Sequence, residues 1–405
     1  MAHILFYPAF PDLERLYDQL YRSIWHFSPM AGRINKITFA FSGPATELLE
    51  GDDCLLSASS RMSPDFDPDI VNFAPDFLGR ISIIPESELL HANDSVDAIF
   101  VWNAAVKQTV KDAQGIGQAQ KADVVVVDPN SVQQETLAAI KFAYSLWSIE
   151  ELDSLVAESY SLFQEHATKW KGRSISAFGN GPSLSATVSD KVDLGDSVRA
   201  VCNSTICDEQ SILYLNPELL FCGDPVQHCG VSRYAGDFRR GMAKALENPK
   251  RVLFTQLGYV PYFRSVTPQE CHNRIIGIGN DRRPKFNLNL EAEYLSAATA
   301  NIFTMLVLPV ACTLTKNIDI YGCDGMPFRE ASNPWQHANE MDYSKSMSVT
   351  HRVHKSFWNR NYEEEYWSYC RDLSDILATA EQDQYTIRVR TPSFVPALAS
   401  RFTDS

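Results

Sequence analysis

The chain has 405 residues, of which 45% are hydrophobic and 11% aromatic, and its formal net charge is −14. At about 150 residues per domain this length predicts two or three domains, and the apolar content excludes wholesale disorder. The excess of acidic residues argues against nucleic acid as a partner. Peripheral membrane association is possible only through a local basic patch. The nine cysteines include no CxxC pair, which favours a reduced protein over a disulfide framework or a zinc site.

The N-terminal residues, MAHILFYPAFPDLERLYDQ, have no basic stretch, so we expect no signal peptide. In chain order, apolar runs at 3–10, 36–43, 96–103 and 122–131 predict buried strands, and the spacing of apolar residues over 13–27 predicts a helix. Strands that alternate with helices predict a parallel sheet covered on both faces.

An acidic stretch over 149–170 predicts a helix that separates this series from a second one. The most apolar run, 301–314, is too short to span a bilayer, and we interpret it as a buried helix before the next strand. We therefore expect a cytoplasmic protein without a transmembrane segment. The second series of predicted strands covers 174–181, 197–203, 218–225, 251–257, 274–280, 317–325 and 385–392.

The resulting prediction is an α/β protein with two Rossmann-like domains, whose mainly parallel sheets are flanked by helices. We expect an N-terminal domain over 1–150, a helical linker over 151–173 and a second domain over 174–405. The polar and aromatic stretch 326–361 has no clear periodicity, which is typical of a functional loop or lid.

The turn in SISAFGNGPSLS follows the first strand of the second series. Gly179 and Gly181 fit the first two positions of a dinucleotide fingerprint, but Leu184 stands at the third. The next strand ends in Asn203 instead of the acid that binds ribose hydroxyls. Both departures count against NAD or FAD, and the chain contains no GxxxxGK[ST] motif for a P-loop.

A glycine turn that opens a helix presents backbone N–H groups, which favours binding of an anion such as phosphate. Asn180, Ser183 and Asn203 would add uncharged hydrogen-bonding groups suited to a base, a ribose or a phosphate. An ordinary tight turn that binds no ligand is the alternative.

The order of these motifs resembles that of the family 42 sialyltransferases. The motifs are GNGPSL after a strand, CN after the next strand, DP after a third, and IYGCDG after a helix. They are also similar to the wider group of 6-hydroxymethylpterin diphosphokinase-like proteins and motility-associated glycosyltransferases. The resemblance covers about 174–392. It implies a Rossmann-like domain that binds a CMP-sugar without a metal or other cofactor.

The resemblance also implies roles for individual residues. The nucleotide would be held by the glycine turn, with Asn180 and Ser183 beside Gly179 and Gly181, and by Asn203. Asp224 in FCGDPVQH matches a polar residue at the end of the third strand and would join the nucleotide site. Asp324 in IYGCDG matches the acid after the late strand and would be catalytic. The alternative for both acids is a turn-stabilising Asp before Pro or Gly.

Transfer of the sugar requires a general base, and the resembled family supplies it from a His before the last helix. Two histidines stand there, His351 and His354 in VTHRVHKSFWNR. We predict His354 as the base, because it is nearer that helix, with His351 second. In a local helix the two would share a face. A metal bound by the pair and two solvated loop histidines are the alternatives.

Together these features predict a glycosyltransferase of polysaccharide biosynthesis that moves a sialic acid or related ulosonic acid from CMP to a glycan acceptor. The N-terminal domain would cover the cleft or receive the acceptor. A pterin diphosphokinase-like phosphotransferase that uses ATP and Mg²⁺, and a non-catalytic nucleotide-sugar-binding protein, are the alternatives.

Overall fold

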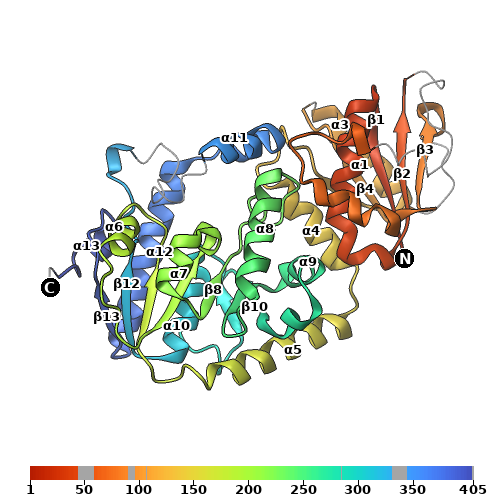
Figure 1. The fold of residues 1–405 in the computed structure, drawn as a ribbon. Helices are drawn as coiled ribbons and strands as arrows, with labels where there is room; N and C mark the ends of the chain where they lie inside the picture. The colour runs from red at the N-terminus through yellow and green to blue at the C-terminus, as the bar shows by residue number, and fades with distance from the viewer. Residues whose placement is uncertain (44–58, 90–95, 106, 284, 331–343, 404–405) are drawn as a thin grey trace. The chain divides into compact units, whose positions relative to one another are not determined.

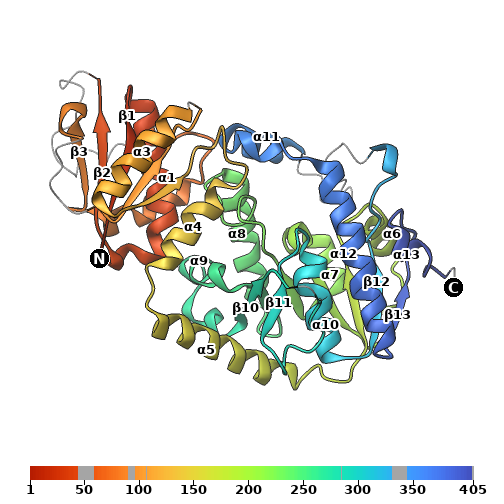
Figure 2. The same ribbon diagram turned by 180° about the vertical axis from the view of Figure 1, so that it is seen from behind.

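The computed structural model describes residues 1–43, 59–89, 96–105, 107–283, 285–330 and 344–403 (Figures 1 and 2). The chain divides into two compact units, each of which is discontinuous in sequence. Unit 1 comprises Met1–Ile149, Pro225–Asp237 and Ser344–Arg360. Unit 2 comprises Glu150–Asp224, Phe238–Tyr343 and Asn361–Ser405.

The first change of unit, after Ile149, lies at the predicted domain boundary near residue 150. The second predicted domain was continuous over 174–405, and here the structure differs. Two segments from within that range, 225–237 and 344–360, belong to unit 1. The sequence pattern cannot reveal this exchange, because it depends on contacts with residues far away in the chain.

Unit 1 is built on a five-stranded parallel sheet in the order β3-β2-β1-β4-β5. These strands belong to the red-to-orange part of the chain in Figure 1. The central strand β1 has a mainly buried run of side chains, as expected for a parallel sheet covered on both faces. The strands are β1 (Ala2–Phe10), β2 (Ile34–Phe41), β3 (Ile81–Pro85), β4 (Ala98–Val101) and β5 (Asp123–Val126).

Helix α1 (Leu13–Phe27) begins where Asp12 accepts a hydrogen bond from the Arg15 N–H at 2.9 Å, which satisfies one of the free amides of the first turn. It buries eleven of its fifteen residues, so it belongs to the core of unit 1. Among its described residues, unit 1 also contains helices α3 (Lys107–Gln120), α4 (Glu135–Ser145) and α11 (Ser344–Val353), with 3-10 turns η1 (Ser28–Arg33), η3 (Ser59–Arg61), η4 (Pro68–Phe77), η5 (Glu86–Glu88) and η12 (Lys355–Trp358).

Unit 2 is built on an eight-stranded parallel sheet in the order β11-β10-β9-β8-β7-β6-β12-β13. Chain order reverses at β6, because β7 pairs on one side of it and β12 on the other. The strands are β6 (Ile175–Phe178), β7 (Val198–Cys202), β8 (Leu219–Phe221), β9 (Val252–Gln256), β10 (Ile275–Asp281), β11 (Leu295–Ala297), β12 (Asn317–Tyr321) and β13 (Thr386–Val389).

The apolar run 301–314 forms a buried π-helical turn, η9 (Phe303–Val307), that continues as α10 (Leu308–Leu314) and leads into β12, as predicted. Long helix α12 (Tyr362–Gln382) contacts β13 and α13 (Pro396–Ala399) (Figure 2). The remaining elements are α5 (Ile149–Ala167), α6 (Ser183–Ser189), η6 (Asn203–Cys207), α7 (Glu209–Leu215), α8 (Arg233–Leu246), η7 (Leu257–Tyr259), α9 (Val260–Ser265), η8 (Gln269–Arg274) and η10 (Phe328–Glu330).

The predicted fold class is confirmed: both sheets are parallel and carry flanking helices. Each strand predicted from an apolar run is present, and within the described residues only the edge strands β3 and β11 were not predicted. Across the described part of the chain, no helix has the length and apolar character needed to cross a membrane.

Candidate functional site

Seven of the nine predicted site residues follow the carboxyl ends of four neighbouring strands of unit 2, β8, β7, β6 and β12. In open α/β sheets, ligands bind outside this edge, where the chain order reverses. Here that position lies between β6 and β12. The seven residues are Gly179, Asn180, Gly181, Ser183, Asn203, Asp224 and Asp324.

The glycine turn after β6 packs against the loop after β12, which explains its two glycines. A Cβ atom at Gly179 would lie 2.5 Å from the Gly322 carbonyl oxygen, and one at Gly181 would lie 2.4 Å from Asp324 Oδ2. The Gly179 N–H donates to the Tyr321 carbonyl and the Gly181 N–H to the Gly322 carbonyl, both at 2.8 Å. Glycine is therefore required here for close approach of two backbones.

Asp324 closes the same turn through Ser183, the first residue of α6. The Ser183 N–H donates to Asp324 Oδ1 at 2.9 Å, and the Ser183 hydroxyl donates to Asp324 Oδ2 at 2.7 Å. The carboxylate thus stands where a bound anion would meet the start of the helix. The backbone N–H groups of Gly179, Gly181 and Ser183 thus already donate to acceptors within the protein. The prediction that the N–H groups of this turn are available to an anion is corrected for these three residues.

The environment of Asp324 also changes its acidity. Burial raises the pKa of this carboxyl above its usual value, and the two hydrogen bonds from Ser183 only partly oppose that effect. Asp324 therefore holds its proton more tightly than an exposed aspartate does. A group of this kind near a ligand site makes binding of an anion depend on pH.

Asn203 is the most distinctive residue at this edge of the sheet. Its φ of +49° lies in the left-handed region, which Asn adopts more readily than most residues other than Gly. Its Oδ1 atom is buried and has no hydrogen-bond partner among the described residues. Next along the chain, the Ser204 hydroxyl accepts a hydrogen bond from Asn180 Nδ2 at 3.0 Å. The side-chain amides of Asn180, after β6, and Asn203, after β7, thus lie at neighbouring strand ends.

Asp224 lies farther along the same edge. Strands β8 and β12 are separated by β7 and β6, so at about 4.8 Å per strand Asp224 and Asp324 flank an edge roughly 14 Å wide. The Gly223 carbonyl before Asp224 accepts from Gln256 Nε2 at 2.8 Å, and Gln256 Oε1 accepts from Asn280 Nδ2 at 2.8 Å. Gln256 and Asn280 are not among the predicted site residues, although both stand at the carboxyl ends of predicted strands.

The two predicted bases lie in unit 1, and the structure gives them different surroundings. His354 has no exposed surface, and its Nδ1 atom is hydrogen-bonded to Glu135 Oε1, at the start of α4. Arg22 lies 3.5 Å from the same carboxylate oxygen and donates to the Val353 carbonyl at 2.7 Å. His354 Nε2 has no partner among the described residues, and a Cβ atom at Gly230 would lie 3.0 Å from it.

The electrostatics of this buried cluster favour a charged carboxylate. Burial alone would raise the pKa of Glu135, but the charge and hydrogen bond of His354 and the charge of Arg22 outweigh it and lower the pKa. A general base must come within hydrogen-bonding distance of the proton that it takes. Because His354 has no exposed atom, its buried contact with Glu135 suits a structural role instead, in which it anchors α11 and η12 to α4.

His351, three residues earlier, is exposed and packs against the Trp358 ring at a centroid distance of 4.5 Å. The two histidines therefore do not share one environment, because α11 ends at Val353 and His354 lies in the turn that follows. The prediction that one of them is the base stays a prediction. The exposed imidazole of His351 is the one that a substrate can reach without a change in the surrounding chain.

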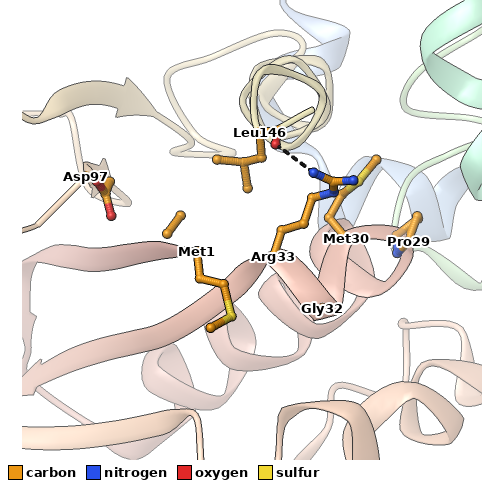
Figure 3. A pocket seen from close by; sticks show the side chains of 8 residues that line it. Met1, Pro29, Met30, Gly32, Arg33, Asp97 and Leu146 are labelled. Carbon is orange, nitrogen blue, oxygen red and sulfur yellow. Dashed lines mark hydrogen bonds between the residues drawn. The ribbon is translucent and has the colours of Figure 1, made fainter. Parts of the chain in front are cut away.

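Two cavities, one in each unit, lie at the opposite, amino ends of the strands. One, of about 670 Å³ in unit 1, is lined by Arg33 and Asp97 among others (Figure 3). Arg33 donates to the Leu146 carbonyl at 3.2 Å, as the dashed line in Figure 3 shows. The other, of about 650 Å³ in unit 2, lies beside Lys316 and Tyr385. Neither coincides with the predicted site, and we favour the strand carboxyl ends because the chemistry-bearing side chains gather there.

No group of three His, Cys, Asp or Glu side chains with metal-site geometry occurs within the described ranges. Comparisons of the chain with protein-family models, with curated proteins and with solved structures found no match. The case for a function therefore depends on the geometry at the edge of the sheet in unit 2.

Proposed function

We propose that the protein is a glycosyltransferase that moves a sialic acid or a related ulosonic acid from a CMP-activated donor to a glycan acceptor. The donor would bind outside β6, β7 and β12 of unit 2. The observation that carries this proposal is Asn203, whose buried Oδ1 atom has no partner among the described residues. Leaving such an acceptor unpaired costs about 1–3 kcal/mol, which a ligand with a matching donor would recover.

A cytidine nucleotide carries suitable donors, since the cytosine amino group and both ribose hydroxyls can donate to an amide oxygen. The neighbouring side chains Asn180 and Ser204 are uncharged, so the nucleoside would be recognised by hydrogen bonds instead of an ion pair. Because Asp324 occupies the start of α6, we place the nucleoside, rather than the phosphate, nearest the glycine turn.

In the proposed reaction, an acceptor hydroxyl oxygen attacks the anomeric carbon of the donor sugar. The bond between that carbon and the phosphate oxygen breaks, CMP leaves with the electron pair, and the hydroxyl proton passes to a base. His354 and His351 are the predicted bases, and the exposed His351 is the first to test. His351→Ala should lower the rate of CMP release with acceptor present by about 10²–10⁴-fold if it has this role.

A thermal-shift panel of CMP, UDP, GDP, ATP and NAD, each with and without EDTA, tests the proposal. CMP at 100 times its dissociation constant should stabilise the folded protein by about 2.7 kcal/mol, and EDTA should leave this shift unchanged. A response to ATP that EDTA abolishes, without a response to CMP, would contradict the proposal and favour the Mg²⁺-dependent phosphotransferase.

A further inference from the structure

Two exposed aromatic side chains of unit 2, near in the structure to the segment that follows Asp324, are in contact with each other. Phe328 is 42% exposed and Trp367 50%, and their rings stack. Together with Phe394, at 58%, they are the only aromatic residues among the exposed large hydrophobic side chains of the described ranges. Scattered single apolar residues are common on protein surfaces, whereas a cluster of large ones marks a binding surface. We call Phe328 and Trp367 the aromatic cluster.

The members of the aromatic cluster are tied to one segment of backbone. The rings of Phe328 and Trp367 stack at a centroid distance of 4.3 Å and an interplanar angle of 14°. The buried Tyr366 donates from its hydroxyl to the Met326 carbonyl at 2.8 Å and also packs edge-on against Phe328. The aromatic cluster is therefore held against the segment that follows Asp324.

The aromatic cluster lies among charged groups of both signs. Glu363 and Glu364 precede Trp367 on α12 by four and three residues and Arg371 follows it by four, so all three lie on the same side of the helix, and all are exposed. Arg329, next in the chain to one member of the cluster, is also exposed. Exposed carboxylates beside an aromatic face suit a sugar, whose hydroxyl groups donate to the carboxylates while its C–H face packs on the ring.

We propose that the aromatic cluster binds a pyranose ring of the glycan acceptor, with the Trp367 ring, backed by Phe328, as the stacking surface and Glu363 and Glu364 as hydrogen-bond acceptors. This inference rests on the proposed function for its choice of a glycan, and it adds the acceptor site to that function. Its position against the segment that follows Asp324 would bring the acceptor hydroxyl to the donor edge of the same unit.

Saturation-transfer NMR with lactose, cellobiose, maltose and N,N′-diacetylchitobiose, each in the presence of CMP, tests the inference. We expect at least one disaccharide to receive saturation, mainly at C–H protons on one face of a pyranose ring. Trp367→Ala should weaken this binding about tenfold or more, and Trp367→Phe should restore most of it. Leu213→Ala, which removes a 74% exposed apolar side chain from α7, serves as the matched control and should leave binding unchanged.

The CMP thermal shift of each variant separates failure of this inference from failure of the proposed function. A normal CMP shift with no saturation of any disaccharide, or with saturation unaffected by Trp367→Ala and Phe328→Ala, would overturn the inference alone. Disaccharide binding that depends on Trp367 without any CMP shift in the wild type would instead overturn the proposed donor. Co-sedimentation with phosphatidylglycerol vesicles that Trp367→Ala abolishes, without sugar binding, would assign the cluster to a membrane and overturn the inference.

Discussion

Replacement of His354 by Ala should destabilise unit 1 strongly. The side chain has no exposed surface, and its partner Glu135 is only 1% exposed, so the variant leaves a buried carboxylate without its closest hydrogen-bond donor. A hydrogen bond to a charged group is worth about 1.5–3 kcal/mol, and breaking a buried ion pair by removing one partner costs about 3–5 kcal/mol. Arg22, at 3.5 Å from Glu135, compensates in part, which places the expected loss near 3 kcal/mol.

Urea unfolding followed by tryptophan fluorescence and far-UV circular dichroism would measure this loss. In thermal unfolding of a unit of this size, a loss of about 3 kcal/mol lowers the melting temperature by roughly 6–12 °C. His351→Ala is the matched control, because it removes the same side chain three residues earlier from an exposed position, and it should change stability by less than about 0.5 kcal/mol. Equal stability of the two variants would refute the anchoring role of His354.

Three further predictions concern the turn of unit 2 and the buried cluster of unit 1. Gly181→Ala should destabilise unit 2 by about 1–3 kcal/mol in urea unfolding, because its Cβ would clash with Asp324. The control is Gly115→Ala, in α3 with open space around it, which should be neutral or stabilising by up to about 1 kcal/mol. Asp324→Asn should leave the CMP affinity at pH 7 close to the wild-type value in calorimetry, because the nucleoside, and not the phosphate, is placed nearest the glycine turn that Asp324 occupies. A gain in affinity of about tenfold, or about 1.4 kcal/mol, would place the phosphate beside this carboxylate and contradict that orientation. The lowered pKa of Glu135 contributes stability that is present above the unfolded pKa, near 4.5, and is lost as pH falls through the folded pKa. Glu135→Gln should therefore reduce the slope of the free energy of unfolding against pH in the acid range by up to about 1.4 kcal/mol per pH unit. A slope as steep as that of the wild type would contradict this role.

The sequence predicts the sheets of this protein better than it predicts the surroundings of single residues. Buried strands such as β6 and β9 are visible in the sequence as apolar runs between turns, since a parallel sheet excludes water from both faces. The edge strands β3 and β11 were missed. Strand β3 is half-buried and β11 has three residues, so neither carries a strong apolar pattern.

For the candidate site too, the positions of residues along the sheet can be predicted from the sequence, whereas their individual contacts cannot. That Asn203 and Asp324 stand at one edge of a sheet follows from their positions after strands, because parallel strands share their carboxyl edge. The hydrogen bonds of Asp324 to Ser183 join residues 141 positions apart, and the contact of His354 with Glu135 joins residues 219 positions apart. No local pattern encodes such contacts. The occupied glycine turn and the buried histidine could therefore be found only in the folded structure.

Binding of CMP to a matched pair of asparagine variants tests the proposed donor site most directly. Asn203→Gly removes the amide and keeps a residue that adopts positive φ freely, and Asn216→Gly makes the same change at the left-handed end of α7, which leads into the amino end of β8 and not to the carboxyl ends of the strands. In isothermal titration calorimetry we predict that Asn203→Gly weakens CMP binding about tenfold or more, the loss of one hydrogen bond of about 1.4 kcal/mol, whereas Asn216→Gly binds as the wild type does. Equal CMP affinity of the two variants, or no CMP binding by the wild-type protein, would contradict the account.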